Sequence, residues 1–206
     1  MVEVERAPDL LRYRVDLRSY GRGLEIGASV SIDGCCQTVV ELEDDGERCL
    51  ATFDAIVETL DKTTLGRLEP RHRVSVERSA RVGDEIGGHD VSGHVIGTGR
   101  LVSATRDGRE VSLTVEVDPA WMKYIQHKGY VALDGSSLTV GDVDPEAGRF
   151  DVHLIPETLR LTNFGAKTER CEAGSSPLIN VELDPKTVAI VDTVERVLPG
   201  LLAQKG

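Results

Sequence analysis

The chain has 206 residues, and its composition, 40% hydrophobic and 29% charged, is that of an ordinary globular protein with one large or two small domains. A net charge of −11 argues against a phosphate-backbone partner such as a nucleic acid. No apolar stretch approaches the roughly 20 residues needed to span a bilayer, and the N-terminal sequence MVEVER lacks the apolar core of a signal peptide. We therefore expect a cytoplasmic protein without nucleic-acid or membrane partners.

The first half of the chain predicts short strands joined by turns. Cys35 and Cys36 point to opposite faces if they lie on a strand, and without a C-x-x-C pair the cysteines are expected to be free thiols. The sequence VETL at 57–60 predicts a short helical turn. Val74 and Val76 alternate with polar residues, as on a strand.

The second half shows the same kind of pattern. Hydrophobic residues at every second position of 111–117 predict a strand with one buried face, and VALDG at 131–135 predicts a strand that enters a turn. The sequence PETL at 156–159 predicts another helical turn. Short strands with regular Gly and Asp turns indicate a small barrel or sandwich in each half, so the fold class is all-β.

The end of the chain predicts a helix. Asp184 is suited to the N-cap and Pro185 to the first helical position. Apolar residues then recur at intervals of three and four from Val188 to Leu201, and we expect a break near Pro199-Gly200. The apolar stripe predicts an oligomerisation element, and the alternative is packing on its own barrel.

An internal repeat organises the rest of the chain. Three segments recur in the same order at a separation of about 100 residues: DGCCQTV at 33–39 with DGSSLTV at 134–140, ETL at 58–60 with ETL at 157–159, and TLG at 64–66 with NFG at 163–165. This period is too long for a solenoid and indicates a duplicated domain. We expect domains over 1–86 and 87–183, followed by the helix over 184–203.

Several motifs in this order resemble the riboflavin synthase family. They are DGCCxTV at 33–39, IGGHxxSGHV at 86–95, DGxSLTV at 134–140, LIPETL at 154–159 and DTVERVL at 192–198. The resemblance implies two tandem six-stranded Greek-key barrels and a C-terminal helix. It implies the dismutation of two 6,7-dimethyl-8-ribityllumazine molecules to riboflavin and 5-amino-6-ribitylaminouracil, without cofactor or metal. It also implies a homotrimer with sites between neighbouring subunits, and it allows an association with lumazine synthase.

The resemblance assigns four catalytic candidates, and the reaction explains their chemistry. His94 is the candidate acid or base, because imidazole titrates near neutral pH; the alternative is a structural strand histidine. Cys36 is the candidate nucleophile or ring contact, and the alternative is a small core residue. Ser137 and Thr139 are two apart on a predicted strand, so both hydroxyls project to one face and can bond ring oxygens. Turn capping is their alternative role.

The resemblance also predicts residues that bind the substrate. They are expected to hold the ring and the hydroxyls of the ribityl chain: Thr38, Glu58, Thr59, His89, Ser92, Gly93, Lys128, Glu157, Thr158 and Asp184. The plain alternatives are solvated carboxylates for the two glutamates, a turn-capping histidine, a surface lysine and a helix N-cap for the aspartate.

The start of the chain departs from the family, whose members begin with Met-Phe-Thr-Gly-Ile and place that Phe in the active site. When Asp33 is aligned with Asp134, Met1 falls at about Val102, so the first barrel is expected to lack its opening strand. A misassigned start or trimmed chain, closure by another strand, and loss of activity all remain open. An open barrel exposes unpaired backbone groups, so we expect reduced stability or closure through oligomerisation. The alternative function is a non-catalytic lumazine- or flavin-binding protein.

Overall fold

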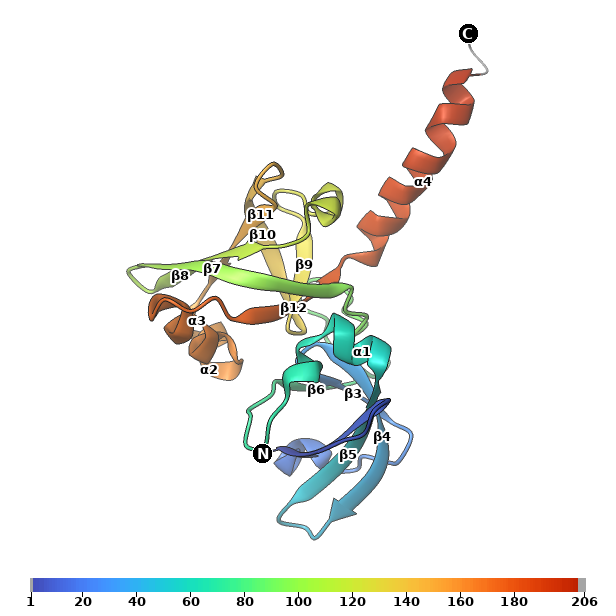
Figure 1. Cartoon of the computed structure of the whole chain (residues 1–206), viewed down its shortest axis with the longest axis vertical. Helices are drawn as coiled ribbons and strands as arrows, with labels where there is room; N and C mark the ends of the chain where they lie inside the picture. The colour runs from blue at the N-terminus through green and yellow to red at the C-terminus, as the bar shows by residue number, and fades with distance from the viewer. Residues whose placement is uncertain (1, 204–206) are drawn as a thin grey trace.

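The computed structural model describes residues 2–203 as two β-rich repeats followed by a long helix (Figure 1). The first repeat holds β1 (Val2–Arg6), β2 (Leu10–Asp16), β3 (Ser29–Ile32), β4 (Cys35–Asp44), β5 (Cys49–Ile56) and β6 (Val76–Arg78). The second holds β7 (Gly97–Asp107), β8 (Glu110–Glu116), β9 (Tyr130–Leu133), β10 (Ser136–Asp144), β11 (Arg149–Leu154) and β12 (Leu178–Leu183). The predicted duplication is therefore visible in the order of strands.

Short helices occupy the connections. The equivalent strands β5 and β11 lead into α1 (Val57–Lys62) and α2 (Pro156–Leu161), so both predicted helical turns are confirmed. The other helices are α3 (Phe164–Glu172), α4 (Pro185–Ala203) and the 3-10 helices η1 (Arg18–Gly21), η2 (Thr64–Arg67) and η3 (Pro119–Tyr124). No helix among residues 2–203 is long and apolar enough to cross a membrane.

Each repeat has its own hydrophobic core. Burial along β8 alternates residue by residue, as the pattern at 111–117 predicts, and this buried face lies inside the second barrel. In the first repeat the rings of Tyr13 and Phe53 stack with centroids 5.4 Å apart, and both residues are fully buried. The predicted all-β class is confirmed for both repeats.

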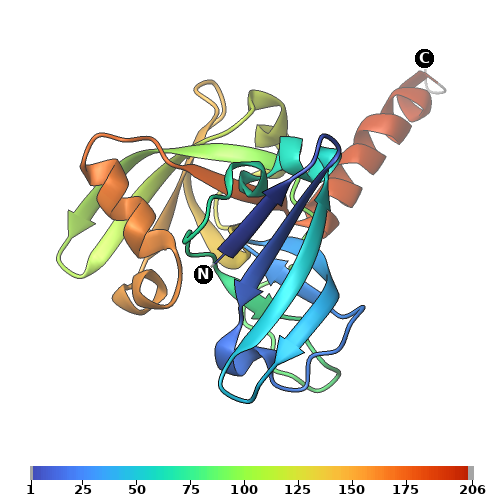
Figure 2. The ribbon, with the colours of Figure 1, turned by 60° about the horizontal axis from the view of Figure 1, so that its bottom comes forward.

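Only the second sheet closes. Its strands follow the order β10-β11-β8-β7-β12-β9, and β12 pairs with β7 from Leu178–Arg100 to Val181–Gly97. The first sheet runs β1-β2-β5-β4-β3-β6, with β1 (dark blue in Figure 2) at one edge, and β1 does not pair with β6 in the described residues. The expected absence of the opening strand is wrong, because β1 is present in the place that β7 has in the second repeat, but it has five residues against eleven in β7. The first sheet is therefore open where the second is closed, and the expected loss of stability stays a prediction.

Two Asp-Gly turns bring the repeats into contact. Asp33-Gly34 joins β3 to β4 and Asp134-Gly135 joins β9 to β10, and all four residues have positive φ, as a two-residue type I′ hairpin requires. Gly34 and Gly135 lie against each other so closely that a Cβ on either would overlap the backbone of the other. The glycines are therefore needed for the turn and for the contact between repeats.

A buried polar network surrounds this contact. The Asn180 amide donates to the carbonyl of Asp33 at 2.7 Å and to the hydroxyl of Thr64 at 2.9 Å. The Asn163 amide donates to the carboxylate of Asp33 at 2.9 Å, and Lys167 pairs with Asp134. The repeats are thus joined by side chains from the second repeat that bind the turn and η2 of the first.

The network holds two carboxyl groups but only one neighbouring ammonium. Burial and the nearby Asp134 raise the pKa of Asp33 from 3.8 to about 7. Burial also raises the pKa of Asp134, although the Lys167 ammonium opposes that change. Asp33 therefore binds a proton near neutral pH in the folded protein and not in the unfolded chain.

We predict that Asp33→Asn makes stability less dependent on pH. Because the pKa of Asp33 is higher in the folded state, its protonation stabilises the fold; this contribution is complete below about pH 4 and is lost as the pH rises through 7. The free energy of unfolding of the wild type therefore falls by about 1 to 3 kcal/mol between pH 5 and pH 8. The asparagine keeps the acceptor oxygen for Ser75 and Asn163 without the charge. Urea unfolding at both pH values measures the difference. Asp9→Asn on the exposed β1–β2 turn is the control, and an unchanged slope in Asp33→Asn contradicts the prediction.

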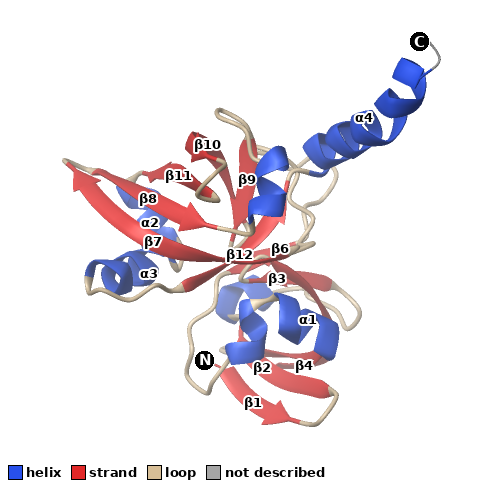
Figure 3. Ribbon diagram, turned by 45° about the horizontal axis from the view of Figure 1, so that its top comes forward, coloured by secondary structure: helices blue, strands red, loops and turns tan. Residues whose placement is uncertain are grey.

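The C-terminal helix α4 extends away from both repeats (Figures 1 and 3). Asp184 caps it as predicted, accepting from the Thr187 amide at 3.1 Å and hydroxyl at 2.7 Å. The expected break near Pro199-Gly200 is wrong, because α4 continues through Pro199 to Ala203. A proline removes one intrahelical hydrogen bond, which the exposed last turns tolerate without ending the helix.

Candidate functional site

Strand β4 carries the first polar face. Cys35, Gln37 and Val39 point into the first core, where Gln37 lies 3.2 Å from the Tyr13 hydroxyl, while Cys36 and Thr38 are exposed. Ser31 and Ser29 on β3 lie directly opposite Cys36 and Thr38. Because opposite residues of an antiparallel pair share a face, the two strands present a thiol and three hydroxyls together. We call these four residues the first-repeat face.

Strands β9 and β10 carry the equivalent face of the second repeat. Ser137 pairs with Ala132 and Thr139 with Tyr130, so the two predicted hydroxyls share a face with an aromatic ring. Tyr130 and Thr139 are exposed. We call Tyr130, Ala132, Ser137 and Thr139 the second-repeat face.

The linker at 88–94 connects the two faces. His89 packs on the second-repeat face: its Nδ1 lies 2.6 Å from the Ser137 hydroxyl, and its ring stacks on Tyr130 with centroids 5.3 Å apart. Four residues later, the Gly93 carbonyl accepts from the Cys36 amide at 3.0 Å on the first-repeat face. One segment therefore spans both faces and brings the predicted residues His89, Gly93, Cys36 and Ser137 into one continuous structure.

A buried carboxylate holds the linker in place. Glu182 on β12 is 3% exposed and accepts from the Ser92 amide and hydroxyl, both at 2.7 Å, and from the Gly93 amide at 2.9 Å. These three hydrogen bonds fix the backbone beside Cys36. Ser92 thus positions the linker, and its hydroxyl is already occupied by Glu182.

The adjacent cysteines point to opposite faces of β4, as predicted. Burial raises the pKa of Cys35 to about 11, although a hydrogen bond from Gln37 opposes it. Cys35 is therefore a neutral packing residue near pH 7. Cys36 is the one exposed thiol among the four free cysteines of the chain, so it is the sulfur that a ligand on the first-repeat face can reach.

Asp184 lies beside the second-repeat face as well as capping α4. Burial acts to raise its pKa, but hydrogen bonds from Thr187 and two backbone amides, together with the nearby His89, lower it below the usual value. The His89 Nε2 is buried and has no hydrogen-bond partner among the described residues. Asp184 therefore stays ionised, close to an imidazole with one free nitrogen.

The two repeats agree with comparisons to known proteins. A family model of the lumazine binding domain matches residues 1–79 and 92–184. Riboflavin synthase of Escherichia coli (strain K12) is 43% identical over 201 residues, covering 96% of this chain and 88% of that protein. The chain belongs to the riboflavin synthase family. Riboflavin synthase of Buchnera aphidicola subsp. Schizaphis graminum (strain Sg) is 36% identical over 200 residues, covering 96% of this chain and 90% of that protein.

Solved structures show the same fold. The crystal structure of LumP complexed with riboflavin superposes with a TM-score of 0.75 at 18% identity, covering 88% of this chain and 92% of that chain. LumP complexed with 6,7-dimethyl-8-ribityllumazine gives a TM-score of 0.72 at 18% identity, covering 87% and 91%. At this identity the likeness concerns the fold alone.

Other residues predicted from the riboflavin synthase pattern lie outside the two faces. His94 is exposed and directly follows Gly93, whose carbonyl binds the Cys36 amide. Lys128 is exposed, with φ +63°, in the turn before β9. Its side chain has no hydrogen bond among the described residues.

The two Glu-Thr-Leu segments form matching first turns of α1 and α2. Glu58 pairs with Lys62 at 2.8 Å, and Glu157 pairs with Arg160 at 2.5 Å. Both carboxylates are exposed and bound to their own helices. Thr59 and Thr158 are half-buried, and their carbonyls accept from Thr63 and Thr162. These four residues reach a ligand only if it extends beyond β4 or β10.

Sequence reasoning missed four residues of the site. Ser29 and Ser31 alternate with Val30 and Ile32, a period-two signal that indicates an outward polar face. Tyr130 opens a predicted strand, but nothing local shows that a histidine stacks on it. Glu182 sits among apolar residues, and only the folded linker explains its burial.

We predict that Gly93→Ala destabilises the protein by roughly 2–4 kcal/mol. Gly93 has φ +81°, and an added Cβ would lie 2.6 Å from the Cβ of Cys36. Gly108→Ala is the matched control, because its φ is +58° and no atom lies within 4 Å of its Cβ position. The control substitution destabilises the protein only because alanine disfavours the left-handed backbone conformation, by about 1 kcal/mol. Chemical unfolding measures both, and equal losses would show that the linker does not pack on Cys36.

Proposed function

We propose that the protein converts two molecules of 6,7-dimethyl-8-ribityllumazine to riboflavin and 5-amino-6-ribitylaminouracil. The observation that carries this proposal is the pair of equivalent faces, because a reaction between two identical molecules needs two related binding sites. Riboflavin synthases at 36 to 43% identity support the same reaction. Orientation of two rings supplies much of the rate in such a reaction, since it removes the entropy of bringing reactants together.

The exposed residues of the two faces take the chemical roles. His94 moves protons, since it is exposed, it follows the Gly93 that binds Cys36, and imidazole is a common proton carrier in enzymes. Cys36 adds to the ring or contacts it, as the accessible thiol. Ser137 and Thr139 bind the ring or intermediate oxygens, and the contact with His89 orients the Ser137 hydroxyl.

The substrate-binding residues divide by what they would contact. Thr38 and His89 lie on or against the two faces and bind the rings, while Asp184 lies near His89. Ser92 and Gly93 hold the linker. The ribityl hydroxyls replace the ion-pair partners of Glu58 and Glu157 and reach Thr59, Thr158 and Lys128. LumP, with the same fold, has been crystallised with lumazine, riboflavin and flavin mononucleotide, which supports this ligand class.

We propose a homotrimer, and the exposed stripe on α4 supports an association of subunits. Val188 packs on the second core, and Tyr124 and Lys123 of η3 bind Asp192 and Glu195. Beyond this contact, apolar side chains face solvent in the single chain: Ile190, Val194, Val197, Leu198, Leu201 and Leu202. Such a stripe is typical of helix association. The four free cysteines fit a reducing cytoplasm, and an association with lumazine synthase stays a prediction.

A non-catalytic lumazine- or flavin-binding protein is the second candidate. The open first sheet favours it, because the β1 edge of the first repeat lacks the backbone pairing that β7 gives the second. The two candidates share a ligand and differ in turnover. Purified protein mixed with 6,7-dimethyl-8-ribityllumazine distinguishes them by riboflavin fluorescence. Binding without riboflavin supports the second candidate, and no binding contradicts both.

For the catalytic candidate, we predict that His94→Ala lowers kcat roughly 100- to 10,000-fold, the usual loss of a general acid or base. Cys36→Ser also lowers kcat, because it removes the thiol while position 36 stays on strand β4. His153→Gln is the control, because His153 is exposed on β11 and its side chain hydrogen-bonds to Glu110, away from the two faces. Circular dichroism checks that each variant is folded. Turnover unchanged in either site variant removes that residue from the catalytic set.

A further inference from the structure

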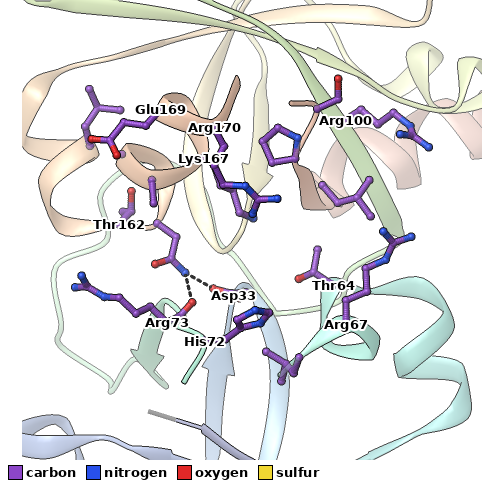
Figure 4. A pocket seen from close by; sticks show the side chains of 18 of the residues that line it. Asp33, Thr64, Arg67, His72, Arg73, Arg100, Thr162, Lys167, Glu169 and Arg170 are labelled. Carbon is purple, nitrogen blue, oxygen red and sulfur yellow. Dashed lines mark hydrogen bonds between the residues drawn. The ribbon is translucent and has the colours of Figure 1, made fainter. Parts of the chain in front are cut away.

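A pocket of about 800 Å³ lies between the two repeats. Its walls come from η2 and the loop that follows it in the first repeat, from α2 and α3, and from the start of β12 (Figure 4). None of the residues assigned to the two faces lines it. The pocket is thus distinct from the two faces, and it meets the proposed ribityl contacts only at Arg160, the ion-pair partner of Glu157.

The lining is basic in an acidic protein. Its charged residues are six cations and three carboxylates: Arg67, Arg73, Arg100, Arg160, Lys167 and Arg170, and Asp33, Glu69 and Glu169. The whole chain carries a net charge of −11. The pocket therefore carries a net positive charge, opposite in sign to the net charge of the whole chain.

Most of these cations have no internal partner. Lys167 pairs with Asp134, and Arg160 with Glu157. Within residues 2–203, no ion pair neutralises the other four, which come from both repeats: Arg67, Arg73, Arg100 and Arg170. Figure 4 shows Arg67 and Arg100 on one side of the pocket and Arg73 on the other, with His72 between them.

We propose that this pocket binds a small molecule that carries a diphosphate, such as a nucleoside diphosphate. A planar guanidinium binds two phosphate oxygens at once, and guanidinium groups from several sides match a multivalent anion better than a single phosphate. The volume is within the range of sites for small organic ligands. Thr64 and Asn163 add polar groups to the lining. The burial-raised pKa of Asp33, at about 7, limits the negative charge at the base of the pocket.

Calorimetric titration with inorganic pyrophosphate and with ADP tests the proposal in the full chain. We expect saturable binding with a Kd below about 1 mM, weakening as sodium chloride is raised because the contacts are ionic. The double variant Arg67→Gln/Arg170→Gln removes one guanidinium from each repeat and should weaken binding at least tenfold. Both residues are exposed, so the variant is expected to fold, and its melting temperature checks this.

The control is Arg109→Gln, an exposed arginine in the β7–β8 turn, and it should leave the Kd unchanged. Absence of binding overturns the proposal and shows that the four unpaired arginines of the pocket are ordinary solvated side chains. Binding that survives in the double variant, or that lumazine displaces, also overturns it, because the anion then occupies another site. The readout does not depend on riboflavin formation, so this proposal and the proposed function can fail separately.

Discussion

The contact between two Asp-Gly turns determines how the rest of the molecule is arranged. Each turn needs glycine for its own positive φ, and each glycine also lets the other turn approach without a Cβ between them. The buried carboxyl groups of Asp33 and Asp134 then lie in one network, closed by Asn163, Lys167 and Asn180. Since the turns lead directly into β4 and β10, this contact also sets the relation between the two polar faces.

The linker joins the two faces into one site. Its His89 end lies on Ser137, its Gly93 end lies on Cys36, and Glu182 fixes the segment between the repeats. Positions on strands and a short tethered linker are well suited to hold flat ligands in register, because their backbone hydrogen bonds allow little movement. The acid–base and thiol candidates therefore sit on the rigid part of the molecule, while the glutamates at the edges sit on short exposed helices.

Much of this organisation could be predicted from sequence because it depends on local pattern. The spacing of the repeats, the alternation at 111–117, the opposite faces of Cys35 and Cys36 and the cap at Asp184 all follow from period and residue type. The path of the linker could not be predicted, because it depends on Glu182, about 90 residues away. The continuous helix through Pro199 was missed because a local rule predicted a break, whereas an exposed last turn tolerates the lost hydrogen bond.

We propose that one chain carries two related lumazine-binding faces joined by the linker. This arrangement can be tested with a crystal structure of the protein grown with 6,7-dimethyl-8-ribityllumazine. We expect two ligand molecules per chain, one against Cys36 and Thr38 and one against Ser137 and Thr139. A ligand bound only at one face, or bound away from both, would contradict it.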